Sequence, residues 1–361
     1  MAQALPNTIF SGNYKEGHIQ GIAVDTERGF VYYSFTTILL KTDLAGNPLG
    51  IVNNLAGHLG CIAYDKERNL IWGSLELKHD AIGKGITDRI GRELAEEDSF
   101  YLVAFDCAKI DRMELDAEKD GIMGAVYLRE VAEDYAETDE VCQKPHRYGC
   151  SGIDGVSLGP VFGEAPDAPK KIMVAYGVYG DPEREDNDYQ VLLQYDPEEM
   201  VKCARPLDQS APHHTGPDAC EARYFFYTGN TRYGIQNLEY DPYSGNWLVA
   251  VYCGKKETFV NFPLFVIDGK KSPALLPLEG RGGEQGLVLT SAKLGEAGKD
   301  SRIFGSFFPY GSTGIASLGD GRFYFSHNGA IREEKIFYSH LNLYRYNPDS
   351  PALFEACEDE A

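Results

Sequence analysis

Two histidines occupy equivalent positions in neighbouring, nearly identical segments. The segment GHIQGIAVDTERGFVYYS (17–34) returns forty residues later as GHLGCIAYDKERNLIWGS (57–74), so His18 corresponds to His58. An imidazole gains and loses a proton near neutral pH, which suits a general base or a metal ligand. The fold requires the repeated apolar residues, but it does not require the histidines. His18 and His58 are therefore the first candidate catalytic residues.

Polar residues recur at one further position of the repeated segments. In the first segment this position holds Gln20, and in a later one it holds Asp154, whose carboxyl group can orient a histidine base. We therefore predict that Asp154 is catalytic together with His18 or His58. The equivalent residues of the last two segments are Gln236 and Thr313.

Tyrosines and arginines precede several of these segments and predict a pocket for an anion. Arg147-Tyr148-Gly149 and Arg232-Tyr233-Gly234 share one pattern, and Tyr310 stands at the same place before the fifth segment. Tyrosines would form aromatic walls, and arginines would attract a carboxylate or a phosphate. The alternative is that each arginine pairs with a carboxylate at the surface. The predicted substrate-binding residues are Gln20, Gln236, Tyr148, Tyr233, Tyr310, Arg147, Arg232 and Glu239.

Carboxyl groups from separate repeats raise two further hypotheses. Glu239 lies in NLEYD, where other repeats have alanine or serine, and its alternative role is to pair with Arg232. A glycosidase needs two carboxyl groups about 5–10 Å apart, for which Asp154, Glu76 and Glu239 are the candidates. A divalent metal is the only cofactor that the residues suggest, and no two of the candidate histidines have a short ligand spacing such as HxH or HxxxH. Its predicted ligands are His18, His58, His146, His327 and Glu76.

The repeated segment has the pattern of a β-hairpin. A short apolar strand, IAVD or IAYD, precedes a polar turn whose Gly or Asn accepts a positive φ, and a second strand follows. The same pattern returns at 153–177, 235–252 and 312–327. A third strand follows each of the five hairpins and ends at Asp43, Asp106, Asp196, Asp268 or Asn347.

Repeats of antiparallel strands that cannot bury both faces alone stack radially as the blades of a propeller. The predicted fold is all-β, a single five-bladed β-propeller over 1–361, and a further hairpin within 283–300 makes six blades the alternative. The segment NTIFSGNY (7–14) has no blade of its own, so we expect it to close the ring by completing the C-terminal blade. The expected blade cores are 18–56, 58–130, 150–229, 233–279 and 311–357.

The repeat pattern GIAxDxxxxxxYxS…LxKxD resembles the β-propeller superfamily that includes NHL, YVTN and SMP-30-like repeats. The resemblance covers most of the chain and implies a blade rather than an activity. No family-defining catalytic motif accompanies it, so it assigns no functional residue. The start of each inner strand in a propeller faces the central channel, which places the candidate residues at the mouth of that channel.

The composition restricts the partners. The 361 residues include 34 Lys and Arg against 55 Asp and Glu, and the net charge of -21 disfavours nucleic acid and anionic membranes. No apolar run reaches the roughly 18 residues of a membrane helix, and MAQALPNTIF is unlike a signal peptide, so we expect a cytoplasmic protein. The eight cysteines form no CxxC pair and are expected to be reduced.

These features predict a hydrolase, lyase or isomerase that acts on a small anionic metabolite, for example one derived from a sugar. His18 or His58 would be the base, and Asp154 would orient it. Arg232 and Tyr233 would hold the substrate. The alternative is a non-catalytic propeller that binds a ligand or a protein through the loops over the channel. The sequence leaves the oligomeric state open.

Overall fold

Five β-sheets account for most of the chain, of which the computed structural model describes residues 5–92 and 95–357. The first sheet contains β2 (Ile19–Asp25), β3 (Phe30–Phe35), β4 (Ile38–Asp43), β5 (Pro48–Asn53) and β9 (Leu115–Asp116). The second contains β6 (His58–Asp65), β7 (Leu70–Leu77), β8 (Ser99–Asp106) and β10 (Met123–Tyr127). The third contains β11 (Cys150–Gly159), β12 (Lys171–Val178), β13 (Tyr189–Tyr195), β14 (Ala222–Tyr227), β18 (Ala274–Pro277) and β19 (Gln285–Val288).

The N-terminal strand completes the last sheet, as predicted. The fourth sheet contains β15 (Arg232–Asp241), β16 (Asn246–Tyr252), β17 (Leu264–Ile267), β20 (Glu296–Ala297) and β21 (Phe304–Ser306). The fifth contains β22 (Ile315–Ser317), β23 (Arg322–Ile331), β24 (Ile336–Tyr346), β25 (Phe354–Ala356) and β1 (Thr8–Phe10). In this sheet β1 pairs antiparallel with β24 and places Ile9 opposite Leu341. The first and last parts of the chain are thereby joined in one sheet.

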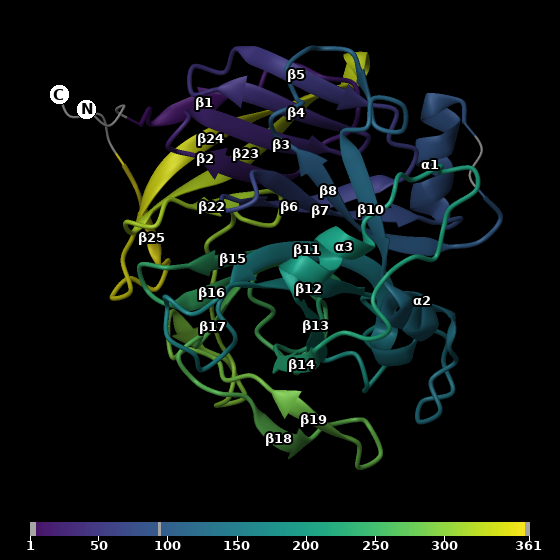
Figure 1. Cartoon of the computed structure of the whole chain (residues 1–361). Coiled ribbons are helices and arrows are strands. Elements are labelled where there is room, and N and C mark those ends of the chain that lie inside the picture. The colour runs from purple at the N-terminus through teal and green to yellow at the C-terminus, as the bar shows by residue number, and fades with distance from the viewer. Residues whose placement is uncertain (1–4, 93–94, 358–361) are drawn as a thin grey trace.

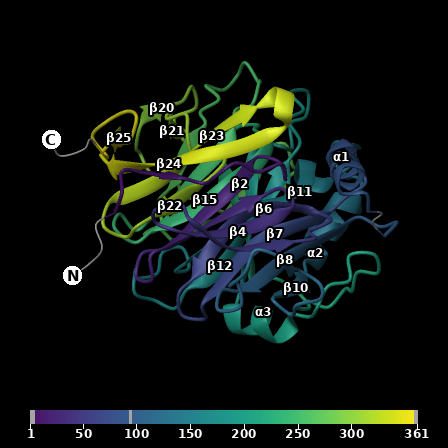
Figure 2. The same ribbon diagram turned by 90° about the horizontal axis from the view of Figure 1, so that it is seen from above.

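The five sheets form a ring in chain order (Figures 1 and 2). Their first strands, β2, β6, β11, β15 and β22, contact one another in that sequence, and β22 contacts β2. The prediction of an all-β, five-bladed β-propeller is confirmed. The six-bladed alternative is wrong, because the strands within 283–300 extend existing sheets: β19 pairs in parallel with β14, and β20 pairs with β21.

The repeated aspartate closes the hairpin turn. The carboxylate of Asp25 accepts the backbone N–H groups of Glu27 and Arg28, both at 3.1 Å. Gly29, with a φ of 72°, then reverses the chain in a conformation that most other residues avoid. Turn geometry therefore explains why the aspartate and the turn have the same spacing in the two segments. It gives no structural reason for the two leading histidines.

A separate apolar cluster fills each gap between neighbouring sheets. Trp72 of β7 packs with Val156 of β11 between the second and third sheets, and Ile22 of β2 packs near Tyr324 of β23 between the first and fifth. All four side chains are buried. Burial of one such side chain stabilises the fold by roughly 1.5–3 kcal/mol. The ring is thus held by five similar interfaces rather than by one central core.

Three α-helices and two 3₁₀ turns lie between the strands. They are α1 (Ala81–Ile90), α2 (Arg129–Ala136), α3 (Pro197–Cys203), η1 (Arg147–Gly149) and η2 (Arg332–Glu334). Helix α1 begins where the carboxylate of Asp80 accepts the N–H groups of Ile82 and Gly83, and it ends at Gly91, whose φ is 66°. Helices α1 and α2 lie on the same side of the propeller, at the right of Figures 1 and 2.

The helices and the thiols concern two further expectations, that no segment is a membrane helix and that the cysteines are reduced. The longest described helix, α1, has 10 residues, and no helix in the described ranges is long and apolar enough to cross a bilayer. All eight cysteines belong to the described residues, and all are free. Burial raises the pKa of the Cys61 thiol to about 12, so this sulfur stays protonated and unreactive.

Candidate functional site

One end of the central channel opens into a cavity of about 390 Å³. The starts of β2, β6, β11 and β15 contribute residues to its lining, and α1 forms another part of the wall. The structure therefore brings many of the predicted site residues together at a channel mouth. Those that line the cavity are His18, Gln20, His58, Glu76, Asp154, Tyr233 and Gln236.

β-Bulges determine which side chains enter this cavity. The pairing of β2 with β3 skips Gln20, that of β15 with β16 skips Gln236, and that of β11 with β12 is interrupted around Asp154. A bulged residue leaves the regular ladder, and its side chain is re-aimed. The equivalent residue of β6 is Gly60, at which a Cβ would lie 3.0 Å from Asp154 Oδ1. The absence of a side chain there leaves space for the Asp154 carboxyl group.

His58 faces two carboxyl groups. Its Nδ1 lies 3.8 Å from Asp154 Oδ1 and 3.9 Å from Glu76 Oε2. These separations exceed a hydrogen bond, but an oxygen atom of a ligand can contact both the imidazole and a carboxyl group at about 2.8 Å. The amide of Gln236 donates to Asp154 Oδ2 at 2.9 Å. The pair of His58 and Asp154 is thus arranged around a position that a ligand can occupy.

Lys78 holds Glu76 in its place. The Lys78 ammonium lies 2.8 Å from Glu76 Oε2 and donates to the Ser151 carbonyl at 2.7 Å. The other oxygen of Glu76 accepts the Ile153 N–H at 2.6 Å. Gly152, with a φ of 120°, permits this approach because a Cβ there would overlap the Glu76 carboxylate. Glu76, predicted as a metal ligand, is therefore committed to an ion pair.

Burial sets the protonation states of these groups. Burial and the charge of Lys78 lower the pKa of His58 to about 3, so the imidazole is neutral at pH 7. Burial and the charge of Glu76 raise the pKa of Asp154 well above its ordinary value. Burial lowers the pKa of Lys78, but attraction to Glu76 and Asp80 outweighs it, and the net shift is upward. The site combines a neutral base with a carboxyl group that tends to keep its proton.

His18 is bonded within its own sheet. The amide of Gln20 donates to His18 Nε2 at 3.0 Å, which requires this nitrogen to be unprotonated. Burial and the charge of Arg89 lower the pKa of His18. His18 therefore lines the cavity as a neutral side chain, and the two carboxyl groups lie beside His58 instead.

Helix α1 supplies a wall of the cavity that the repeats do not predict. Ile82, Ile86 and Arg89 of this helix line the cavity, and Lys78 precedes the helix. These residues lie in an insertion between β7 and β8, so comparison of the repeats does not reveal them. The spacing of Asp80 and Gly91, an N-cap and a C-cap residue, is the signal that predicts a helix here.

Arg147 and Tyr148 lie outside the cavity. The Arg147 guanidinium is 3.4 Å from a carboxylate oxygen of Glu284 and 3.6 Å from one of Glu137. The Tyr148 hydroxyl donates to Glu284 at 2.5 Å. Tyr148 adopts a φ of 56°, which turns the chain before β11 begins. The surface ion pair, the alternative interpretation of this arginine, is the one the structure shows.

Tyr310, His327 and Arg232 also lie outside the cavity lining. Tyr310 and His327 stack with ring centroids 3.5 Å apart. The Nε2 atom of His327 lies 3.1 Å from the Tyr344 hydroxyl. Arg232 is exposed, with its guanidinium 5.3 Å from the ring centroid of Tyr233. The tyrosine of this pair lines the cavity, whereas the arginine does not.

Glu239 borders a different cavity. This smaller cavity, of about 140 Å³, is lined by residues that lie further along the inner strands. Glu239 follows Gln236 by three residues on β15, which is roughly 10 Å along a strand. Its carboxylate accepts the Ser317 N–H at 2.7 Å, and burial raises its pKa to about 8. It forms no ion pair with Arg232 within the described ranges, and it does not join Asp154 in one site.

The predicted metal ligands are not assembled. His146 packs against Tyr135 and Tyr179, away from the cavity lining, and His327 lies beside Tyr310. Of the five predicted ligands, only His18, His58 and Glu76 line the cavity. Their donor atoms do not form a group close enough to hold one ion, so far as the described residues extend.

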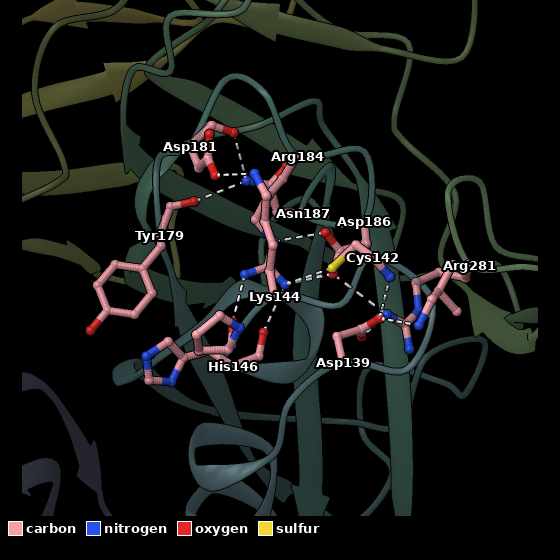
Figure 3. Close-up of polar contacts among 12 residues, drawn as sticks. Asp139, Cys142, Lys144, His146, Tyr179, Asp181, Arg184, Asp186, Asn187 and Arg281 are labelled. Carbon is pink, nitrogen blue, oxygen red and sulfur yellow. Dashed lines mark hydrogen bonds and ion pairs between the residues drawn. The ribbon is translucent and has the colours of Figure 1, made fainter.

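One other cluster has the residue types of a metal site. Asp139, Cys142 and Asp186 place their donor atoms within 4.8 Å of one another. Figure 3 shows that two arginines occupy this cluster. Arg184 donates to both oxygens of Asp186 at 2.7 Å, while Arg281 pairs with Asp139 and lies 3.5 Å from Asp186. Two guanidinium groups neutralise the two carboxylates, so the cluster is an ion-pair network that joins three loops.

Comparisons with known proteins identify no family for this chain. No protein-family model matches it, and no curated protein is similar in sequence. A functionally unknown protein from Desulfotomaculum acetoxidans DSM 771 is 9% identical over 94% of this chain and 69% of its own, with a TM-score of 0.34. The Dos1 propeller is 9% identical over 90% of this chain and 78% of its own, with a TM-score of 0.35. The residues of the cavity are therefore the basis for a function.

Proposed function

We propose that the protein is an enzyme that performs acid–base chemistry on a small anionic metabolite, such as one derived from a sugar. The observation that carries this proposal is the position of His58 Nδ1 within 3.9 Å of two carboxyl groups, those of Asp154 and Glu76, in a cavity at the channel mouth. A neutral base beside a protonated acid suits hydrolysis, elimination or isomerisation.

Each group has a distinct role in this chemistry. Neutral His58 removes a proton from a hydroxyl group, a water molecule or an acidic C–H. Asp154 donates a proton to the leaving or rearranging oxygen. Burial raises the pKa of Glu76, while Lys78 favours its ionised form, in which it stabilises the imidazolium that forms on His58. Acid–base catalysis of this kind contributes about 10²–10⁴-fold in rate.

The size and lining of the cavity fit a small polar ligand. At roughly 30 Å³ for each water-sized atom, a volume of about 390 Å³ holds about a dozen non-hydrogen atoms. The side-chain carbonyl oxygens of Gln20 and Gln236 can accept hydrogen bonds from hydroxyls, because their NH₂ groups already have protein partners. Tyr233 and Tyr252 offer aromatic surface. Such a mixture of a few polar groups and aromatic walls is typical of metabolite sites.

A non-catalytic binding protein is the second candidate. The separation of 3.8 Å between His58 Nδ1 and Asp154 Oδ1 favours it, because catalytic base and orienting carboxylate are usually hydrogen-bonded. In that case the same cavity would retain a metabolite unchanged. The two candidates therefore differ in turnover and not in the location of the ligand.

The test is a depletion assay on a defined pool of small carboxylates and phosphate esters, followed by mass spectrometry. We expect the wild-type protein to convert at least one compound, and His58→Ala and Asp154→Asn to lower that rate by about 10²-fold or more. His79→Ala is the matched control, because His79 is exposed and lies outside the cavity. Conversion that survives Asp154→Asn, or retention of a compound without any product, would contradict the enzyme proposal.

We also propose that the protein works in the cytoplasm. All eight thiols are free, including Cys142 of the loop before β11 and Cys150 at the start of that strand. Free thiols in this number suit a reducing compartment. The net charge of -21 supports a small-molecule ligand over nucleic acid or an anionic membrane.

A further inference from the structure

Arg89 stands at the junction of two cavities. It lines the inner cavity of about 390 Å³, and it also lines an outer groove of about 800 Å³. Its Nη1 lies 3.0 Å from where a Cβ of Gly17 would be, at the start of the first sheet. The helix inserted in the second sheet therefore carries a guanidinium across to the first sheet, between the inner cavity and the outer groove.

The Arg89 guanidinium forms no ion pair with a carboxylate of the described residues. Within residues 5–92 and 95–357, no carboxylate oxygen lies within 4.0 Å of its guanidinium nitrogens, the limit for an ion pair. Arg92, one turn further along, shows the contrast, because it pairs with Glu118 at 2.7 Å. A planar guanidinium without a carboxylate can bind the two oxygens of an anion in parallel.

The remaining charges of the inner cavity cancel. Glu76 and Lys78 form an ion pair at 2.8 Å. His18 and His58 have lowered pKa values and are neutral at pH 7, and Asp154 has a raised pKa that favours its protonated form. The unbalanced charge of the cavity lining is therefore the single positive charge of Arg89.

We propose that Arg89 is the carboxylate subsite of this cavity, and that the ligand is a monoanion whose uncharged, hydroxyl-bearing part reaches His58 and Asp154. A phosphate monoester carries about −1.5 to −2 charges at pH 7, which one arginine neutralises only in part. A carboxylate carries one charge and matches the guanidinium in shape. The status of this ligand as a substrate rests on the proposed function, whereas its binding does not.

A structural role for Arg89 makes different predictions. The residue lies in the last turn of α1, where a cation interacts favourably with the helix dipole. If that were its only role, replacing it would lower stability slightly and leave anion binding unchanged. A readout of ligand binding therefore separates the two roles.

The experiment is a titration of the full chain with acetate, the simplest carboxylate, at low ionic strength and followed by the imidazole NMR signals of His18 and His58. We expect saturable shifts for the wild type. For Arg89→Met we expect the affinity for acetate to fall by about tenfold or more. Arg89→Lys, which keeps the charge but not the two parallel donors, is expected to be intermediate. Lys84→Met is the matched control, because it removes one positive charge from an exposed position of the same helix.

Inorganic phosphate is titrated in parallel. Three results would overturn the inference: no saturable response of the wild type to acetate, equal acetate binding by Arg89→Met, or tighter binding of phosphate than of acetate. The readout does not depend on turnover. Acetate binding at Arg89 in a protein that converts no compound would retain the subsite and remove the enzyme proposal.

Discussion

The side-chain amide of Gln236 donates to the Asp154 carboxyl group at 2.9 Å, across the boundary between the fourth and third sheets. The same amide donates to the Tyr233 carbonyl at 2.8 Å, so both of its hydrogens are used. Both residues occupy bulges near the start of inner strands. The orientation of the Asp154 carboxyl group is thus fixed by the neighbouring blade, and disturbance of either sheet would alter the site.

Asp154→Asn should change how stability depends on pH. The pKa of Asp154 is raised in the folded state, so above about pH 4 the folded chain holds a proton that the unfolded chain has released. The wild type therefore loses stability as pH rises towards the raised pKa, and the isosteric amide does not. We expect the stability advantage of Asp154→Asn, measured by urea unfolding at a series of pH values, to grow from pH 4 to pH 7. A constant difference between the two proteins would refute the raised pKa.

Lys78→Met should destabilise the protein strongly. Lys78 is 6% exposed and Glu76 5%, so the substitution leaves a buried carboxylate without its partner. Removal of one member of a buried ion pair costs about 3–5 kcal/mol of unfolding free energy. The double variant Lys78→Met with Glu76→Gln should recover most of this loss in denaturant unfolding. Lys84→Met, at an exposed position, should stay within about 0.5 kcal/mol of the wild type.

The pH profile of the reaction should be bell-shaped. The rate, measured as kcat/KM on a substrate found in the depletion assay, should rise as pH increases through about 3, where His58 becomes neutral. It should fall again as pH rises through the raised pKa of Asp154, because the acid then loses its proton. Asp154→Asn should lack the alkaline fall. An unchanged alkaline limb in this variant would assign the limb to another group.

Gly152→Ala should disrupt the support of Glu76. Gly152 has a φ of 120°, and an added Cβ would overlap the Glu76 carboxylate, which accepts the Ile153 N–H. We expect the unfolding free energy, measured in urea, to fall by about 1–3 kcal/mol or more. Gly85→Ala on α1 is the contrasting variant, because a Cβ there meets no atom within 4 Å. It should leave stability unchanged or raise it by up to about 1 kcal/mol.

The repeats made part of the site predictable. Gln20, Asp154 and Gln236 could be aligned because they hold the same place in successive blades, and the structure shows that this place is a bulge directed into the channel. Five blades and the closing role of 7–14 followed from the same periodicity. Arg89 and Lys78 could not be found in this way, because α1 and its flanks lie in an insertion that occurs once.

Two kinds of error have physical causes. Glu239 was grouped with Asp154 because both lie on inner strands, but three residues along a strand separate it from Gln236 by roughly 10 Å. Arg147 and Tyr148 were grouped by their resemblance to Arg232 and Tyr233, yet they meet Glu284 outside the cavity. Alignment of the repeats predicts the blade in which a residue lies. The depth of that residue along the channel and the direction of its loop depend on the three-dimensional geometry.

The pairing of Thr8 with Asn342 has a consequence for synthesis of the protein in the cell. Strand β1 leaves the ribosome well before its partner β24, because Asn342 follows Thr8 by 334 residues. Until then Ile9 and the first-sheet face that meets Tyr324 have nothing to cover them. Folding must therefore end with a contact of very long sequence separation, a slow and aggregation-prone step.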